Sequence, residues 1–308
     1  MFKYKVVKEL FEIKNLISSS NNFILIVLKA YFQILRHNPP CSEIQCGVEI
    51  TIDIFKKIDD IKIIKISLMC LARILYASKE NSNKILDLID IKLILDYFAI
   101  DEIRQGAMYF VDFILRMKND PLINKMISLN LLEITKTYLE PKFSLLERQK
   151  AIIMFGRIMR YPLYKEMIIQ NDIFEIIHKI INEDNIILKE SSIKFYKKFI
   201  KNCNCNQFKL IQKSSIIKDI VELLGSPNYD NLIIESILFI SKLIQRSDIL
   251  QFDSHILDEL IELKTGEKLD NLSLNPKYAN LLEETQIITK LSKFFFYKDY
   301  FIDEYSGI

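Results

Sequence analysis

Residues 236–244, SILFISKLI, begin with a small residue, Ser236, and carry apolar side chains one, four and seven positions later. That spacing puts the apolar side chains on one face of an α-helix, so the stretch is predicted to be an amphipathic helix. Four further stretches align with it without gaps: SLMCLARIL from Ser67, AMYFVDFIL from Ala107, AIIMFGRIM from Ala151 and SIKFYKKFI from Ser192. We therefore expect five copies of one helix, whose small first residue lets neighbouring helices approach closely.

Two shorter elements recur before these helices. A polar or small residue followed by an amphipathic helix stands at Gly47-Val48, Asp90-Ile91, Asn130-Leu131, Asp172-Ile173, Ser215-Ile216 and, more loosely, His255-Ile256. A still shorter element precedes four of them: NKILDLID from Asn83, NKMISLN from Asn124, YKEMIIQND from Tyr164 and FKLIQKSS from Phe208. The steps from Val48 to Ile256 average about 42 residues, so the pattern predicts a tandem array of three-helix repeats.

The composition agrees with an all-α fold. The chain has 308 residues, half of them hydrophobic, with only six glycines and seven prolines. Folds rich in β-strands need many glycine-containing turns, so helices joined by short loops are favoured.

At this point the chain resembles the armadillo family, whose repeat has a short helix, a helix beginning near a glycine, and a long third helix. The resemblance implies a right-handed α-solenoid of about seven repeats, with HEAT repeats, which have two helices per unit, as the nearest alternative. We expect a single domain over residues 1–308, with capping helices in 1–40, five well-formed repeats in 41–263, and a polar loop (264–278) and capping helix in 264–308. The aromatic run Phe294–Tyr297 is expected to close the end of the core, or else to dock another subunit.

In armadillo proteins the third helices line a concave groove, and the resemblance assigns two groove positions on each. With neighbouring basic positions on the same helix face, the predicted ligand-binding residues are Lys65, Met69, Arg73, Tyr109, Phe113, Arg116, Lys150, Ile153, Arg157, Lys194, Lys198, Lys201, Leu238, Lys242 and Arg246.

Adding Lys62 and Arg160 gives twelve basic residues on this face, which we call the basic stripe, against three nearby acidic residues, Asp112, Glu190 and Glu235. The net charge of the whole chain is only +2. Charge is thus predicted to be segregated, and a basic groove would attract an extended acidic or phosphorylated segment of another protein. Alternatively, arginines and lysines near helix carboxyl ends simply stabilise those ends.

The family's best-known members are nuclear-import adaptors, which read basic peptides with tryptophan and asparagine, and scaffolds, which read acidic segments with lysine and arginine. This chain has no tryptophan, so it is closer to the scaffolds. Two other functions stay open: a structural subunit docked through its convex face or through Phe294–Tyr297, and, less favoured, nucleic-acid binding, because a pI of 8.1 is low for that class.

We expect no enzymatic activity, no cofactor and no metal. Phosphate-loop, dinucleotide-binding, zinc-protease and nucleophile-elbow motifs do not occur in the sequence. His37 with Cys41 and Cys46, and Cys203 with Cys205, lack the paired spacing of structural zinc sites. The three histidines, His37, His178 and His255, fall in different repeats.

The sequence also predicts where the protein resides. The N-terminus lacks the continuous apolar run of a secretory signal, and Phe23–Leu35, interrupted by Lys29, falls short of the roughly 20 residues that a spanning helix needs. Five cysteines, an odd number, suggest free thiols in a reducing compartment. We expect the cytoplasm or the nucleus.

Overall fold

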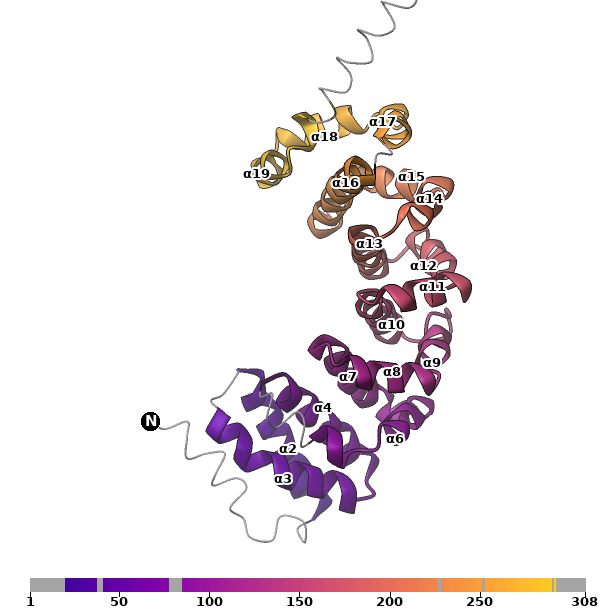
Figure 1. Cartoon of the computed structure of the whole chain (residues 1–308). Coiled ribbons are helices and arrows are strands. Elements are labelled where there is room, and N and C mark those ends of the chain that lie inside the picture. Colours follow the sequence, from indigo (N-terminus) through magenta and orange to yellow (C-terminus); the bar gives the residue numbers. More distant parts are fainter. Residues whose placement is uncertain are drawn as a thin grey trace, which may run out of the picture. The chain divides into compact units, whose positions relative to one another are not determined.

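A computed structural model describes residues 20–37, 41–77, 85–226, 229–250, 253–289 and 291, and within these ranges every regular element is a helix (Figure 1). The side chains of 41–43, 45, 46 and 253–255 are not described. Contacts divide the chain into two units, residues 1–140 (unit 1) and 141–308 (unit 2). Each unit is described by itself, and a single domain over 1–308 stays a prediction.

The five aligned stretches all lie in long helices, as predicted. These third helices are α4 (Ile61–Ala77) and α7 (Asp101–Met117) in unit 1, and α10 (Leu145–Ile158), α13 (Ile186–Lys201) and α16 (Asp230–Leu250) in unit 2. α4 packs on α7, and α13 packs on both α10 and α16 (Figure 1). The small first residues Ser67, Ala107, Ala151, Ser192 and Ser236 are all completely buried.

A glycine shows how closely the third helices of unit 1 approach one another. A Cβ placed on Gly106, the residue before Ala107, would lie only 2.8 Å from the backbone oxygen of Lys65 on α4. Real Cβ atoms do not come so near a backbone atom, so α7 needs glycine at this point. The small residues therefore set the distance between the long helices, as the sequence predicted.

The two shorter helices of the repeat are also present. They are α8 (Asp120–Ser128) and α9 (Leu131–Thr137) in unit 1, and α11 (Pro162–Gln170), α12 (Ile173–Ile181), α14 (Cys205–Lys213) and α15 (Ile216–Glu222) in unit 2. Short 3-10 turns, η2 (Tyr97–Ala99) and η3 (Leu223–Gly225), extend α6 (Ile91–Asp96) and α15. Three helices per repeat are typical of armadillo rather than HEAT units.

Asparagine and aspartate stand where the armadillo pattern has glycine, at the turn between the first two helices. Asn130 and Asp172 have left-handed backbone angles, with φ of 64° and 57°. These residue types tolerate that conformation better than most. Asp90 acts differently: its side chain accepts a hydrogen bond from the Lys92 amide and caps α6.

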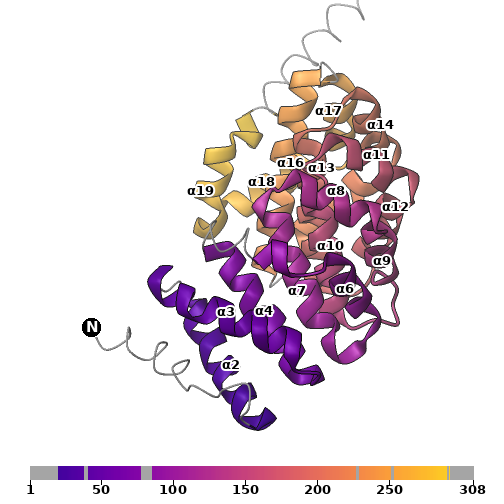
Figure 2. The same cartoon turned by 60° about the horizontal axis from the view of Figure 1, so that its bottom comes forward.

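The predicted helix start at Gly47-Val48 is wrong. Gly47 lies inside one continuous helix, α3 (Cys41–Lys57). A Cβ there would lie 2.3 Å from the ring of Tyr31, which is fully buried on α2 (Asn21–Arg36) and donates to the carbonyl of Ile44. The glycine makes room for a tyrosine rather than for a turn. Figure 2 shows α2, α3 and α4, which pack against one another at the start of unit 1.

Two predictions near the C-terminus are also wrong. Residues 264–278, expected to be a loop, form α18 (Thr265–Ser273) and the start of α19 (Pro276–Thr285), while His255-Ile256 lies in α17 (Asp253–Glu262). Lys264, just before α18, has φ of 53°, the same left-handed turn as Asn130 and Asp172, so α18 is the second helix of this repeat. The prediction for His255 failed because α16 is 21 residues long, so the next repeat begins later than the average spacing implies. The prediction of a loop failed because α18 buries only Thr265 and Leu269 and its sequence is therefore largely polar.

Only part of the predicted capping segments, residues 1–40 and 264–308, falls within the described residues. α2 begins where the Ser20 side chain accepts a hydrogen bond from the Phe23 amide, and α2 packs on α4 as a third helix would. Residues 4–19 and the aromatic run Phe294–Tyr297 lie outside the described residues.

The substitution Gly106→Ala tests the close approach of α4 and α7. We expect the free energy of unfolding to fall by about 1 to 3 kcal/mol, the usual cost of overpacking, although alanine favours a helix by about 1 kcal/mol. Urea denaturation followed by far-UV circular dichroism measures the change. Gly225→Ala is the matched control, because nothing lies within 4 Å of the Cβ position there. A Gly106→Ala protein as stable as wild type would contradict the close packing.

Candidate functional site on the third helices

The structure leaves most of the predicted ligand-binding side chains with some access to solvent. Arg116, Lys194, Lys201 and Lys242 are exposed, and Lys65, Met69, Arg73, Tyr109, Lys150, Ile153, Lys198, Leu238 and Arg246 are half-buried. Two are buried, Phe113 at 1% exposure and Arg157 at 8%. Phe113 and Arg157 are thus covered in this structure, and ligand contact by any of the fifteen residues stays a prediction.

In unit 1, aromatic rings hold the arginines of the basic stripe. The guanidinium carbon of Arg73 lies 5.7 Å from the ring centre of Tyr109 and 5.4 Å from that of Phe113. Arg116 lies 4.6 Å from the same Phe113 ring and makes a 3.1 Å ion pair with the buried carboxylate of Asp112. Burial raises the pKa of Tyr109, and the charge of Arg73 opposes that rise.

In unit 2, carboxylates neutralise the amino-terminal half of the stripe. Lys194 on α13 pairs with Glu190, one turn earlier, and lies 3.7 Å from Glu235 on α16. Glu235 also pairs with Lys197. Burial lowers the pKa of Lys194, but the hydrogen bond and charge of Glu190 and Glu235 outweigh burial and raise it. Lys194 is thus a poor candidate for contacting a ligand.

The carboxyl-terminal half of the stripe in unit 2 stays basic. Lys242 is exposed and donates to the neutral side chain of Gln245 at 3.0 Å. Lys198, at the aligned position of α13, extends over Gly156 of α10: a Cβ on that glycine would be 3.3 Å from its ammonium. Lys201, the last residue of α13, is exposed. Arg246 instead donates to the backbone oxygen of Cys203, a structural contact.

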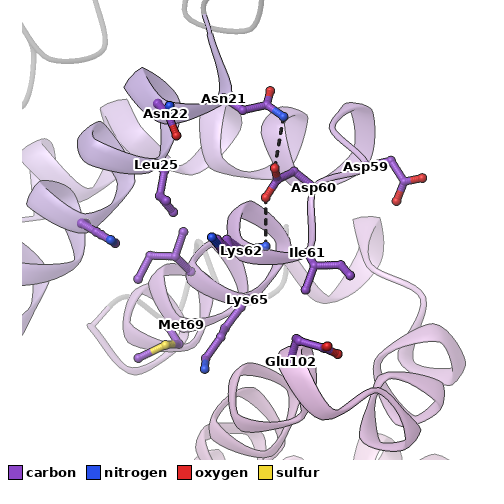
Figure 3. A pocket seen from close by; sticks show the side chains of 12 residues that line it. Asn21, Asn22, Leu25, Asp59, Asp60, Ile61, Lys62, Lys65, Met69 and Glu102 are labelled. Carbon is purple, nitrogen blue, oxygen red and sulfur yellow. Dashed lines mark hydrogen bonds between the residues drawn. The ribbon is translucent and has the colours of Figure 1, made fainter.

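A hollow of about 810 Å³ opens in unit 1 between α2, α4 and the start of α7 (Figure 3). Its lining includes Lys65 and Met69 of the predicted set, together with Leu25 and Lys29 of α2. In Figure 3 the Asn21 amide points to Asp60, whose carboxylate also accepts from the Lys62 amide. Sequence reasoning missed the contribution of α2, because no periodic signal shows which side chains of a capping helix face the next helix.

A serine, a histidine and an aspartate meet in unit 2 in a way that suggests a catalytic triad. His178 of α12 lies 2.7 Å from Asp219 of α15 and 3.3 Å from Ser215. Both contacts involve the same ring nitrogen, Nε2, and Ser215 donates to Asp219 as well. A triad needs the carboxylate and the nucleophile on opposite nitrogens. This cluster therefore connects two neighbouring repeats, and it gives no support for catalysis.

The cysteines that the structure describes are free thiols. Cys70 is completely buried, and burial raises its pKa. Cys203 is buried and Cys205 exposed. Among the described residues, no three histidine, cysteine or acidic side chains gather in a way that could hold a metal ion. The side chains of Cys41, Cys46 and His255 lie outside the description. No helix within the described ranges has both the length and the apolar character needed to cross a membrane.

Comparison with known proteins identifies the fold. No protein-family model and no curated protein sequence matches the chain. Among solved structures, an engineered protein is similar over 93% of this chain and 68% of its own, with 15% identity and a TM-score of 0.68. A computationally designed armadillo repeat protein for modular peptide recognition covers 76% of this chain and 98% of its own, with 13% identity and a TM-score of 0.59.

A third structure is a designed armadillo repeat protein in complex with the peptide (KR)4, similar over 76% of this chain and 98% of its own, with 14% identity and a TM-score of 0.61. At such identities the likeness shows the fold alone. The chain has a divergent armadillo-type α-solenoid fold, as its repeats predicted.

A buried lysine in unit 2 predicts a pH dependence of stability. Lys165 on α11 is only 1% exposed, and its ammonium donates to the backbone oxygen of Phe199 at 3.3 Å. Burial lowers its pKa from 10.5 to about 8. Between those values the unfolded chain holds more protons than the folded one, so stability should rise with pH.

The substitution Lys165→Met should remove this dependence. We expect the free energy of unfolding of wild type, relative to that of the variant, to rise by about 2 kcal/mol from pH 7 to pH 9.5. Denaturant titrations at both values measure it. Lys218→Met, at an exposed lysine of α15, should behave like wild type. An equal pH dependence in wild type and Lys165→Met would refute the assignment.

Proposed function

We propose that this protein is a non-enzymatic scaffold that binds an extended acidic segment of another protein along its third helices. The observation that carries the proposal is the pair Lys198 and Lys242. They occupy aligned positions on the packed helices α13 and α16, and Lys242 donates to a neutral side chain, that of Gln245. Lys201 adds a third positive charge at the end of α13.

The nearby carboxylates sharpen the proposal. Asp112, Glu190 and Glu235 each pair with an arginine or lysine of the basic stripe. In unit 2 the proposal therefore leaves out Lys194, whose charge Glu190 and Glu235 neutralise, and keeps Lys198, Lys201 and Lys242 as ligand contacts. Half-buried Ile153 and Leu238, on α10 and α16, supply apolar contacts between them. Charged contacts that are partly shielded from water are stronger than exposed ones, which contribute about 0 to 1 kcal/mol.

The designed armadillo protein bound to (KR)4 holds a basic peptide. The side chains that we propose as ligand contacts are lysines, which would repel such a peptide, so the proposal predicts the opposite preference. Fluorescence anisotropy with labelled (Asp-Glu)4 and (Lys-Arg)4 peptides tests it directly. The acidic peptide should bind, and its affinity should fall steeply with salt, because the contacts are electrostatic. The basic peptide should not bind.

The double reversal Lys198→Glu, Lys242→Glu should weaken binding of (Asp-Glu)4 by at least about tenfold. Its matched control is Lys213→Glu, Lys218→Glu, which makes the same charge change at two exposed lysines of α14 and α15. Circular dichroism should show that all variants stay helical. Equal affinities for the two peptides, or equal loss in both double variants, would count against these helices as the binding surface.

A second candidate function is a structural subunit held by apolar contacts. Exposed apolar side chains stand at the start of the third helices of unit 2: Leu146 at 47% exposure, Ile187 at 44% and Tyr229 at 44%. A contact made there would persist at high salt, unlike the acidic ligand. Salt dependence therefore separates the two functions.

A further inference from the structure

The hollow of unit 1 has an apolar floor between α2 and α4. Leu25 of α2 and Ile66 and Met69 of α4 line it, and all three side chains are half-buried, so each keeps apolar surface that the fold does not cover. The volume of about 810 Å³ lies within the range of about 300 to 1,000 Å³ that is typical of ligand pockets. A methionine in the floor adapts to apolar groups of different shape. The hollow can therefore take up large apolar side chains of a partner.

Two hydrogen bonds fix how α2 and α4 lie beside the hollow. At the start of both helices the Asn21 side-chain amide donates to the Asp60 carboxylate at 3.1 Å. Further along, the Cys70 thiol donates to the backbone oxygen of Leu28 at 3.5 Å. The two helices therefore run in the same direction, and position 28 of α2 is level with position 70 of α4.

Lysines stand at both ends of the floor. Lys62 lies in the first turn of α4, one turn before Ile66. Lys29 follows Leu28 on α2, so it is level with Met69 at the other end. Both lysines line the hollow, and both are exposed. Seven residues of helix separate the two levels, which amounts to about 10 Å at a rise of about 1.5 Å per residue.

The charges of these lysines are available to a ligand. Within the described part of the chain, no carboxylate lies within ion-pair distance of the ammonium of Lys29 or of Lys62. Lys65, a third lysine of the lining, donates to the neutral side chain of Gln105 at 3.0 Å. The floor is therefore flanked by cations that the described residues do not neutralise.

The acidic residues at the start of α4 do not take up these cations. The Asp60 carboxylate accepts hydrogen bonds from the Asn21 side chain and from the Lys62 backbone amide, so it caps the helix. In Figure 3 the Lys62 side chain extends toward Leu25, whereas the Asp59 carboxylate points away from both. Carboxylates of a partner thus complement the lysines at the two ends of the floor.

We propose that this hollow binds a short segment of a partner protein in which two apolar residues stand between two acidic ones, as in Asp-Leu-Leu-Asp. The leucine side chains contact the floor, and the two carboxylates pair with Lys62 and Lys29. An extended segment advances about 3.3 Å per residue, so acidic residues three positions apart span the same distance of about 10 Å as the lysines. The site goes beyond the proposed function, because it lies wholly within unit 1 and uses none of the lysines assigned there.

The test uses the full chain and three labelled peptides that differ only in their central four residues, Asp-Leu-Leu-Asp, Asp-Ala-Ala-Asp and Asn-Leu-Leu-Asn. Fluorescence anisotropy at low salt gives each affinity. We expect Asp-Leu-Leu-Asp to bind at least about tenfold more tightly than the other two, because one of them loses the apolar contacts and the other loses the charged ones. Equal binding of the alanine peptide or of the asparagine peptide would refute the proposal.

The double reversal Lys29→Glu, Lys62→Glu should weaken binding of Asp-Leu-Leu-Asp at least about tenfold and should strengthen binding of Lys-Leu-Leu-Lys. A misfolded variant would not produce that gain. The matched control is Lys92→Glu, Lys125→Glu, which makes the same charge change at exposed lysines of α6 and α8, outside the hollow. It should bind both peptides as wild type does. A missing gain, or an equal loss in the control, would overturn the site.

The variant Lys198→Glu, Lys242→Glu separates this inference from the proposed function. Its affinity for Asp-Leu-Leu-Asp should stay within about twofold of wild type, because distant sites act independently. Loss of that affinity would assign the peptide to unit 2 and refute the hollow as its site. If (Asp-Glu)4 fails to bind wild type while Asp-Leu-Leu-Asp binds through Lys29 and Lys62, the proposed function fails and the hollow stands. Sedimentation velocity tests a second copy of the chain as the occupant: a dimer that the reversal at Lys29 and Lys62 dissociates would also refute the proposal.

Discussion

The close approach of the long third helices is the constraint on which the rest of this protein depends. Ser67, Ala107, Ala151, Ser192 and Ser236 are completely buried where these helices meet. A larger side chain at these places would push the helices apart and open voids that protein interiors do not tolerate. Because the helices are close, side chains six residues further along can reach the neighbouring helix, as Lys198 does over Gly156.

The repeat position six residues after the small residue has a different environment in each copy. Arg73, Phe113, Arg157, Lys198 and Lys242 all stand six residues after the small residue. In unit 1 the position builds an aromatic cluster, with Phe113 buried beneath two arginines. In unit 2 it ranges from the buried Arg157 to the exposed Lys242. The same repeat position thus carries an aromatic cluster in unit 1 and an exposed positive charge, Lys242, in unit 2.

Acidic residues neutralise part of the basic stripe, either from one turn away on the same helix or from the neighbouring helix. Asp112 and Glu190 pair with residues four positions away on their own helices, and Glu235 reaches lysines of the adjacent helix. A count of twelve basic residues against three acidic ones overstates the available charge, because the three acids all lie where they neutralise the stripe. Lys194 is therefore not part of the surface that we propose as the binding site.

The sequence by itself determined the class of fold, the three-helix repeat and the buried small residues, because helical periodicity and ungapped alignment are local properties of the chain. It wrongly predicted second-helix starts at Gly47 and His255, because no local signal distinguishes a helix start from the interior of a continuous helix. It also predicted a loop where α18 lies, because a largely polar helix lacks the apolar periodicity. Only the tertiary structure decided which stripe residues are covered, which are paired, and that Arg73 and Arg116 share one ring. Those properties depend on the neighbouring helix, which lies about 40 residues away in the sequence.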